Sequence, residues 1–355
     1  MKKITSSIIA ILLAGSLLLT AGCASQSTAV SKTSAAIAAV AADPFGVQVK
    51  LTNQKEDNIL IQTAIPEFSG FSSADELNSK ISQLSKDGIA RLKEDTKDLG
   101  DSAGAGSLYY SSFFDYSRNN DVLSVWITSG NYSGGAHGMS WINSFTVNTK
   151  TGTFYTDLGS LFQEPAAGEK KITDRILKTI DEKKDAYFPE APQAVKDRKN
   201  KYSFYLDGGN LIVYFDLYEL IPYAGGIPKF EFPVKDLALK PMLGNQKSLG
   251  ITRLNGTDTA FTNPVYTEND NIYLPLEETA THMGHKVTNS NGKYTVDGKA
   301  AEVKAVGGKV YVPLIYFTET LNDFVIYDGT ALRLFPKTKA AGGSSESVSV
   351  SSANP

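Results

Sequence analysis

Cysteine is almost absent from this chain of 355 residues, because Cys23 is the only one. No disulfide can form within the chain, so its stability must come from hydrophobic cores. Histidine is also scarce, with three residues, and this leaves few ligands for a transition metal. The hydrophobic fraction of 41% and the charged fraction of 21% are typical of a folded globular protein long enough for two domains.

The charge balance is slightly acidic. The formal net charge of −3 becomes −5 if the N-terminal segment is removed, because that segment holds Lys2 and Lys3 and no acidic residue. Nucleic acid and anionic lipid surfaces are poor partners for a chain of this charge. We therefore expect no nucleic-acid binding.

The N-terminus has the features of an export signal. Two lysines precede an apolar run over residues 8–19, which is too short to span a membrane comfortably. The small residues Ala21 and Gly22 directly before Cys23 resemble the lipobox of bacterial lipoproteins. We predict a signal peptide over residues 1–22 and lipid on Cys23, which would anchor the protein in the membrane on its extracytoplasmic face, with palmitate as a typical acyl group.

Two segments are predicted from their composition to be unstructured. Residues 23–43 are rich in Ala, Ser and Thr, which predicts a flexible tether between the lipid and the folded part. Residues 337–355 have a similar composition, with Gly342-Gly343 and a serine-rich end, and are predicted to form a disordered tail.

Residues 44–240 are predicted to form an α+β domain, with antiparallel sheets and two packed helices. The helices are marked by apolar residues at helical spacing over 77–92 and 172–180, and Ser73 with Glu76 forms a capping-box pattern before the first. The strands are marked by alternation and turn signals. They are expected at 47–65 with a turn at 53–58, from 108 to a polar turn at 115–121, at 122–128, at 141–147 before a turn at 149–152, and at 202–206 and 211–215.

The pattern changes near residue 240. Residues 241–250 read as a linker. Residues 251–336 are predicted to form a second, small α+β domain, in which short antiparallel strands surround one helix at 276–284.

Three motifs in the larger domain carry a family resemblance. They are the glycine-rich run at 132–138, the segment Asp157-Leu158-Gly159-Ser160-Leu161-Phe162, and the stretch at 218–233 with Pro222-Tyr223-Ala224-Gly225-Gly226-Ile227-Pro228. Residues 45–239 resemble a domain-of-unknown-function family, which occurs in the extracellular part of a lysozyme-sensing anti-sigma factor and in the non-catalytic region of a peptidoglycan deacetylase. The resemblance implies a cell-envelope protein whose ligand is peptidoglycan or a lysozyme-like protein.

The smaller domain has its own resemblance. Leu254-Asn255-Gly256, then Tyr273-Leu274-Pro275-Leu276 and Val310-Tyr311-Val312-Pro313-Leu314, resemble the copper amine oxidase N-terminal-like domain of wall-associated proteins from Gram-positive bacteria. That module is a non-catalytic stalk, so the resemblance implies no copper and no cofactor. The sequence also excludes a copper amine oxidase, which needs several histidines and a Tyr within Asn-Tyr-Asp/Glu, whereas Ser133 follows Asn131-Tyr132.

His137 is the central residue of the candidate site. It lies in the glycine-rich hairpin between Thr128 and Trp141. This hairpin is either a structural turn, whose glycines supply positive φ, or a ligand-contacting loop. A catalytic histidine would also need an orienting acid and a nucleophile. The candidate ligand-binding residues are Tyr132, Gly134, Gly135, His137, Trp141, Tyr218 and Tyr223.

Two other groups of residues were weighed. His282 and His285 stand three apart on the predicted helix, a spacing that can place two imidazoles on one metal, but the usual further ligands are missing. We therefore predict no metal. Asp216 and Glu219 lie beside the aromatic residues at 202–223, which form either strand core or a polar and aromatic binding surface suited to a basic partner.

Together these patterns predict a lipid-anchored envelope protein of a Gram-positive bacterium. Its larger domain would be a non-catalytic binding module for peptidoglycan or for a lysozyme-like extracellular protein. The alternative is an enzyme, or an accessory subunit, that acts on cell-wall polymers.

Overall fold

The computed structural model describes residues 45–56, 58–97, 108–119, 121–240, 243, 252–259, 261–268, 271–327 and 331–337. The predicted signal peptide, Cys23, the tether, almost all of the linker and residues 338–355 of the predicted tail lie outside the described residues. Within the described part of the chain, no helix is long and apolar enough to cross a membrane.

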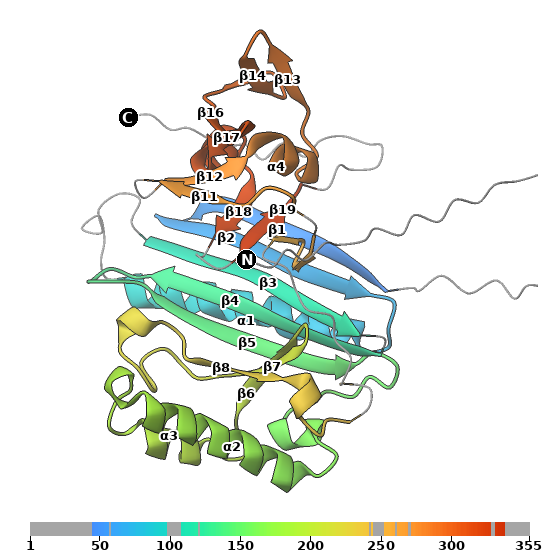
Figure 1. The fold of residues 1–355 in the computed structure, drawn as a ribbon, viewed down its shortest axis with the longest axis vertical. Helices are drawn as coiled ribbons and strands as arrows, with labels where there is room; N and C mark the ends of the chain where they lie inside the picture. Colours follow the sequence, from blue (N-terminus) through green and yellow to red (C-terminus); the bar gives the residue numbers. More distant parts are fainter. Residues whose placement is uncertain are drawn as a thin grey trace, which may run out of the picture. The chain divides into compact units, whose positions relative to one another are not determined.

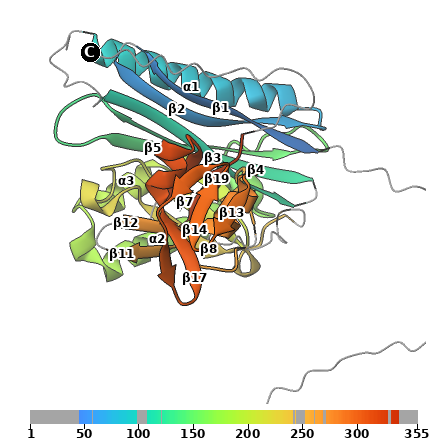
Figure 2. The ribbon, with the colours of Figure 1, turned by 90° about the horizontal axis from the view of Figure 1, so that it is seen from above.

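A five-stranded sheet is formed in chain order, β1-β2-β3-β4-β5 (Figure 1). Its strands are β1 Gly46–Glu56, β2 Ile59–Ser69, β3 Leu108–Asn119, β4 Val122–Tyr132 and β5 Met139–Asn148. Neighbours are antiparallel except β2 and β3, which are parallel and are joined through α1, Ala74–Thr96. The helix lies along one face of the sheet (Figure 2) and buries Leu77 and Ile81 fully in the core. It begins directly after Ser73, but the Ser73 side chain makes no capping bond.

A second layer completes the larger region. It contains a three-stranded antiparallel sheet and two helices: β6 Ser203–Asp207, β7 Asn210–Tyr214, β8 Lys229–Pro233, α2 Pro165–Glu182 and α3 Ala191–Asp197. Short 3-10 turns occur at η2 Leu158–Leu161, η3 Lys184–Ala186, η4 Tyr223–Gly225 and η5 Val234–Asp236. The apolar stripe of α2 packs with the inner residues of β6, β7 and β8. This small sheet contacts the larger one, since the rings of Trp126 and Tyr205 stack 4.3 Å apart and Ser144 Oγ donates to the Phe204 carbonyl at 2.6 Å.

The C-terminal segment consists of short strands around one helix, α4, Leu276–His282. Its strands are β9 Thr252–Leu254, β10 Thr257–Asp258, β11 Tyr266–Glu268, β12 Asn271–Pro275, β13 Val287–Ser290, β14 Lys293–Val296, β15 Lys299–Ala301, β16 Lys304–Val306, β17 Lys309–Pro313, β18 Phe324–Tyr327 and β19 Leu332–Phe335, with a π-helical turn η7 at Tyr316–Thr320. They form sheets β10-β9-β19-β18, β11-β12-β17-β16 and β13-β14-β15. The α+β class predicted from the sequence is confirmed, although β9 and β19 pair in parallel.

Strand β3 provides a docking edge for the C-terminal segment. It pairs with β4 along its length but with β2 only over residues 108–112. Beyond residue 112, the side of β3 that faces away from β4 can therefore contact other elements. The Tyr116 backbone N–H donates to the Gly256 carbonyl at 2.8 Å, and the rings of Phe114 and Phe335 lie 5.6 Å apart. Two parts of the chain that are about 140 residues apart in sequence therefore share one apolar core.

The predicted polar turn at 115–121 is wrong over residues 115–119. Strand β3 continues to Asn119, and Asp115 is completely buried within it. The Asp115 carboxylate accepts from Arg333 Nε at 2.9 and 3.0 Å and contacts Arg253 Nη1 at 3.1 Å. A single carboxylate between two guanidinium groups is adequately compensated, which explains how aspartate can occupy a strand interior.

Asp207, at the end of β6, completes this network. Its carboxylate contacts Arg253 Nη2 at 3.1 Å, which gives two carboxylates and two guanidinium groups in all. Burial raises the pKa of Asp207. Burial would lower the pKa of Arg253, but Asp115 and Asp207 raise it instead. The network ties the C-terminal segment to β3 and β6 through ion pairs.

Ionisation of a buried tyrosine is expected to destabilise the protein at alkaline pH. Burial raises the pKa of Tyr214 to about 12. A phenol whose pKa is higher in the folded state than in the unfolded chain stabilises the fold fully below pH 10, and this contribution is lost as the pH rises through 12. We expect Tyr214 to account for a loss of about 2–3 kcal/mol across this interval. Urea unfolding at pH 8 and pH 11 measures the first half of this loss, about 1.4 kcal/mol.

The Tyr214→Phe variant should show a smaller alkaline loss than the wild type, because phenylalanine cannot ionise. Tyr109→Phe is the control, since Tyr109 is 40% exposed. Equal alkaline losses in the wild type and in Tyr214→Phe would contradict the assignment.

Candidate functional site

The tip of the hairpin between β4 and β5 is shaped by glycine. Gly134 and Gly135 both have φ near +100°, which L-residues with side chains rarely adopt. A Cβ on Gly138 would lie 2.6 Å from the Asn131 carbonyl oxygen, so no side chain fits there. The Tyr132 hydroxyl donates to the Gly135 carbonyl at 2.8 Å and closes the loop. These contacts hold His137, which lies between Gly135 and Gly138, in an exposed position.

His137 joins two tyrosines from a distant part of the chain. Its Nε2 shares a hydrogen bond of 2.8 Å with the Tyr218 hydroxyl, and its ring stacks on Tyr223 with centroids 3.8 Å apart and planes inclined by 22°. Its Nδ1 lies 3.1 Å from the Gly138 carbonyl. Tyr218 has a φ of +69°, an uncommon conformation for a tyrosine. The loop that carries the two tyrosines is thus held in a strained shape at the point where it meets the hairpin.

Further exposed side chains extend this aromatic group. Tyr109 on β3 is 40% exposed and stacks on Tyr132 with centroids 6.3 Å apart, and its hydroxyl lies close to Gly138. Met139 is 43% exposed at the start of β5. We call this set the His137 surface: Tyr109, Tyr132, His137, Met139, Tyr218 and Tyr223. An exposed cluster of rings on a rigid hairpin is a common feature of binding surfaces.

The acidic residues beside Tyr218 are paired internally. Arg198 donates through Nε to Glu219 at 2.7 Å and through Nη2 to Asp216 at 2.6 Å and to Glu219 at 2.5 Å. The bond to Glu219 is the main reason why the pKa of Arg198 is raised. The two carboxylates therefore hold the loop after β7 in place, and Arg198 balances one of their two negative charges.

Trp141 does not join the His137 surface. It lies on β5 opposite Ser129, and its ring is 6.3 Å from that of Tyr110, within the core cluster that includes Ile59 and Leu92. Of the other residues predicted from the sequence, Gly134 and Gly135 shape the hairpin, while Tyr132, His137, Tyr218 and Tyr223 meet at the surface. The sequence reasoning missed Tyr109 and Met139, whose places follow only from the pairing of β3, β4 and β5.

The prediction that His282 and His285 share a helix is wrong, because His282 is the last residue of α4 and His285 lies beyond its end. His282 Nδ1 lies 2.9 Å from the Glu278 carbonyl, and its ring is near Phe261. His285 lies between two carboxylates, with Nδ1 2.7 Å from Asp297 and Nε2 2.7 Å from Asp323. In the part of the chain that the structure describes, no group of three or more histidine, cysteine or acidic residues is arranged to hold a metal.

The contacts of His137 define how its ring is held. Its contacts are a backbone carbonyl, a phenol hydroxyl and an aromatic ring. The Gly138 carbonyl can orient the imidazole, but general-base catalysis would also need the other ring nitrogen to face a nucleophile of the substrate. Here the nitrogen that would face a substrate already bonds to Tyr218, so the ring is positioned to present stacked aromatic faces.

Comparison with known families supports the predicted domain type. Residues 159–235 match the model of DUF3298, a protein family of unknown function, and residues 52–140 match the model of the deacetylase PdaC. Both matches lie within residues 45–239 and confirm the family resemblance found there in the sequence. The stalk-like domain over residues 251–336 remains a prediction. No curated protein is significantly similar to the chain.

Two solved structures of DUF3298 proteins are similar to this chain. One is from Bacteroides fragilis and is 16% identical. The match covers 56% of this chain and 94% of the Bacteroides chain, with a TM-score of 0.39. The other is from Pseudomonas aeruginosa, is also 16% identical, covers 58% and 99%, and has a TM-score of 0.34. At these scores neither structure says anything about function.

Proposed function

We propose that this protein is a non-catalytic binding module of the cell envelope, anchored through lipid on Cys23, and that the His137 surface binds the glycan of peptidoglycan. The observation that carries the proposal is the exposed stack of His137 on Tyr223, with Tyr218 fixed by a hydrogen bond. Aromatic faces held rigidly at a surface suit the apolar faces of sugar rings, and little side-chain entropy is lost when they bind.

The family matches agree with this proposal. The model of the deacetylase PdaC covers β4 and the tip of the hairpin and ends at the start of β5, and the DUF3298 model covers the loop of Tyr218 and Tyr223. A role as a cell-wall accessory module fits both. Arg198 balances one of the two negative charges of Asp216 and Glu219, which reduces their attraction for a basic protein such as lysozyme.

Retention of the purified protein on insoluble peptidoglycan tests the proposal. The double variant Tyr218→Ala/Tyr223→Ala should be retained about tenfold less than the wild type, because each lost stacking face contributes about 0.5–1.5 kcal/mol. His137→Ala should weaken retention as well, since it frees both tyrosines. Immobilised lysozyme serves as the second ligand in the same experiment.

Ile315→Ala is the matched control, because Ile315 is an apolar side chain with 55% exposure in the C-terminal segment. It should be retained like the wild type. Failure of the wild type to bind peptidoglycan, or equal retention of the double variant, would sink the proposal. Release of sugar fragments by the wild type, lost in His137→Ala, would establish the enzyme alternative instead.

A further inference from the structure

A cleft lies along the outer edge of β5. This strand is the last in the five-stranded sheet, and among the described residues no other strand pairs with it on the side away from β4. The cleft has a volume of about 540 Å³. Asn143 and Phe145 line it from one face of the strand, and Ile142 and Ser144 line it from the other. Because both faces contribute, the cleft follows the strand edge itself, and we call it the β5 edge cleft.

The chain itself covers one end of this edge. The Tyr155 N–H donates to the Thr146 carbonyl at 2.8 Å, and residues 153–155 run beside β5 from that point onward. Main-chain groups of an antiparallel strand face the same side at every second residue, so the N–H and carbonyl of Ser144 also face away from β4. Within the described part of the chain, neither of these two groups has a hydrogen-bond partner. The edge is therefore open where the cleft lies.

The opposite wall of the cleft supplies a positive charge. This wall contains side chains from residues 198–204, which connect α3 to β6 and begin that strand. Arg198 is paired with Asp216 and Glu219. Lys201 is exposed and has no ion pair among the residues that the structure describes. An ammonium group without a partner beside an open strand edge suits a peptide that carries a carboxylate.

The β5 edge cleft begins close to the His137 surface. Met139 of that surface lies three residues before Ile142 on the same strand, which corresponds to roughly 10 Å at the rise of a strand. Asp216, which lines the cleft, lies two residues before Tyr218. A glycan stacked at the His137 surface would therefore bring its substituents to the mouth of the cleft.

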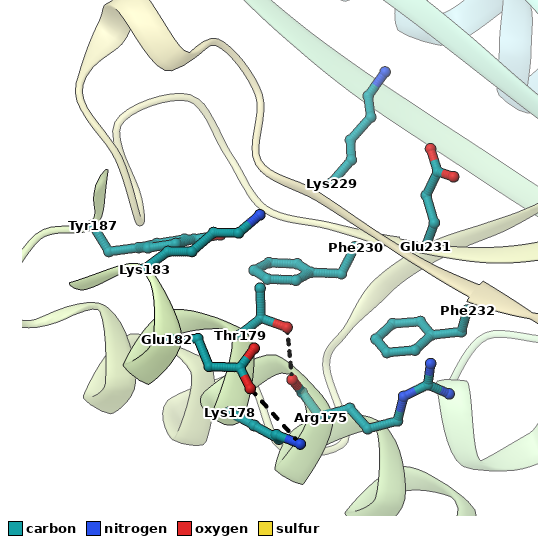
Figure 3. A pocket seen from close by; sticks show the side chains of 10 residues that line it. All are labelled: Arg175, Lys178, Thr179, Glu182, Lys183, Tyr187, Lys229, Phe230, Glu231 and Phe232. Atoms are coloured by element: carbon teal, nitrogen blue, oxygen red, sulfur yellow. Dashed lines mark hydrogen bonds and ion pairs between the residues drawn. The ribbon is translucent and has the colours of Figure 1, made fainter. Parts of the chain in front are cut away.

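The hollow between α2 and β8 is of a different kind (Figure 3). Phe230 and Phe232, which line it, are buried and belong to the core of this layer. Lys178 at its rim pairs with Glu182 at 3.7 Å. Its aromatic lining is thus part of the packed core and is not a binding face.

We infer that the β5 edge cleft binds the peptide of peptidoglycan in an extended form. This inference rests on the proposed function and names a second part of the same ligand, because peptidoglycan carries short peptides on its glycan. A peptide carbonyl would accept from the Ser144 N–H, a peptide N–H would donate to the Ser144 carbonyl, and a carboxylate of the peptide would pair with Lys201.

The edge also fits the form of such a peptide. The stretch from Ile142 to Thr146 spans roughly 14 Å, which is the length of a short extended peptide. Hydrogen bonds to a strand edge use only N–H and carbonyl groups of the main chain. They are therefore available to residues of either hand.

Binding of soluble peptidoglycan fragments to the full-length protein tests the inference. One fragment keeps its peptides, and the other has lost them to an amidase. The wild type should bind the peptide-bearing fragment about tenfold more tightly, because two main-chain hydrogen bonds and one charge contact are lost with the peptide.

Lys201→Glu should weaken binding of the peptide-bearing fragment about fivefold and leave binding of the other fragment unchanged. Lys199→Glu is the matched control. It makes the same change of charge at an exposed residue that does not line the cleft, so it should bind both fragments like the wild type.

A second pair of variants tests the open N–H of Ser144. Ser144→Pro removes this group, and proline is tolerated on an edge strand where the N–H faces away from the ladder. Ser144→Ala keeps the N–H, but both variants lose the hydroxyl that donates to the Phe204 carbonyl, so their difference reports the N–H. Ser144→Pro should bind the peptide-bearing fragment about threefold more weakly than Ser144→Ala. Thermal unfolding of both variants is measured alongside.

The outcomes separate this inference from the proposed function. Equal affinities of the wild type for the two fragments would overturn the peptide site and leave the glycan site standing. Binding of neither fragment would overturn both. If the wild type and the Tyr218→Ala/Tyr223→Ala variant bind the peptide-bearing fragment equally well, and neither binds the other fragment, the peptide site is supported and the glycan site is refuted.

Discussion

Replacing Asp115 with alanine is expected to lower the free energy of unfolding by about 3–5 kcal/mol. Asp115 is fully buried and is the carboxylate that contacts both Arg253 and Arg333. Each arginine is only 6% exposed. Without Asp115, Arg253 keeps its contact with Asp207, but Arg333 loses the carboxylate that accepts from its Nε, so positive charge buried away from water is less well compensated.

Urea denaturation of the purified protein measures this effect, with Asp121→Ala as the control. Asp121 is exposed in the same β3–β4 turn, and its backbone carbonyl, rather than its side chain, accepts a hydrogen bond from the Thr149 N–H. Removal of its side chain should therefore change the free energy of unfolding by less than about 0.5 kcal/mol. Similar stabilities of Asp115→Ala and Asp121→Ala would refute the role given to the network. Peptidoglycan retention by a still-folded Asp115→Ala protein should persist, since the His137 surface contains none of these residues.

The second large effect is expected for Gly256→Ala, at about 2–4 kcal/mol. Gly256 has a φ of +83°, and a Cβ there would lie 2.5 Å from the ring of the buried Phe114. Two penalties therefore combine: the left-handed backbone disfavours any side chain, and the ring cannot move, because it packs against Tyr116 and Phe335.

Gly292→Ala separates the two penalties. Gly292 has nearly the same φ, +80°, but open space around its Cβ position, so its substitution should cost only about 1 kcal/mol of backbone strain. The difference between the two variants, measured by thermal unfolding, is the contribution of the contact with Phe114. Equal costs would mean that the docking of the β9–β10 turn on β3 is loose.

Local patterns predicted much of the fold. The alternation at 122–128 and 141–147 corresponds to β4 and β5, and the helical spacing at 77–92 and 172–180 lies within α1 and α2. These elements each bury one regular face, so hydrophobic periodicity is visible in the sequence itself. The helix α3 and the parallel pairing of β9 with β19 left no such signal, because a seven-residue helix has too few turns and strand pairing depends on distant residues.

Asp115 shows why charge patterning can mislead. A run of polar residues normally indicates a turn, but the partners that stabilise this carboxylate lie more than 130 residues further along the chain. The candidate site was only partly predictable for a similar reason. His137 and Tyr223 were identified through family motifs and composition, but their stacking depends on packing between distant loops. The sequence around Trp141 does not indicate that its side chain packs against the core.

The pairing of β9 with β19 also sets an order of assembly. Strand β9 begins at Thr252, whereas its partner ends at Phe335, so that sheet cannot close until more than eighty further residues have been synthesised and delivered. Asp115 and Asp207 are by then already in place for Arg253, but Arg333 arrives last. A chain that stops before Arg333 would leave the docking edge of β3 incomplete, and this edge would then be a target for a chaperone or a protease.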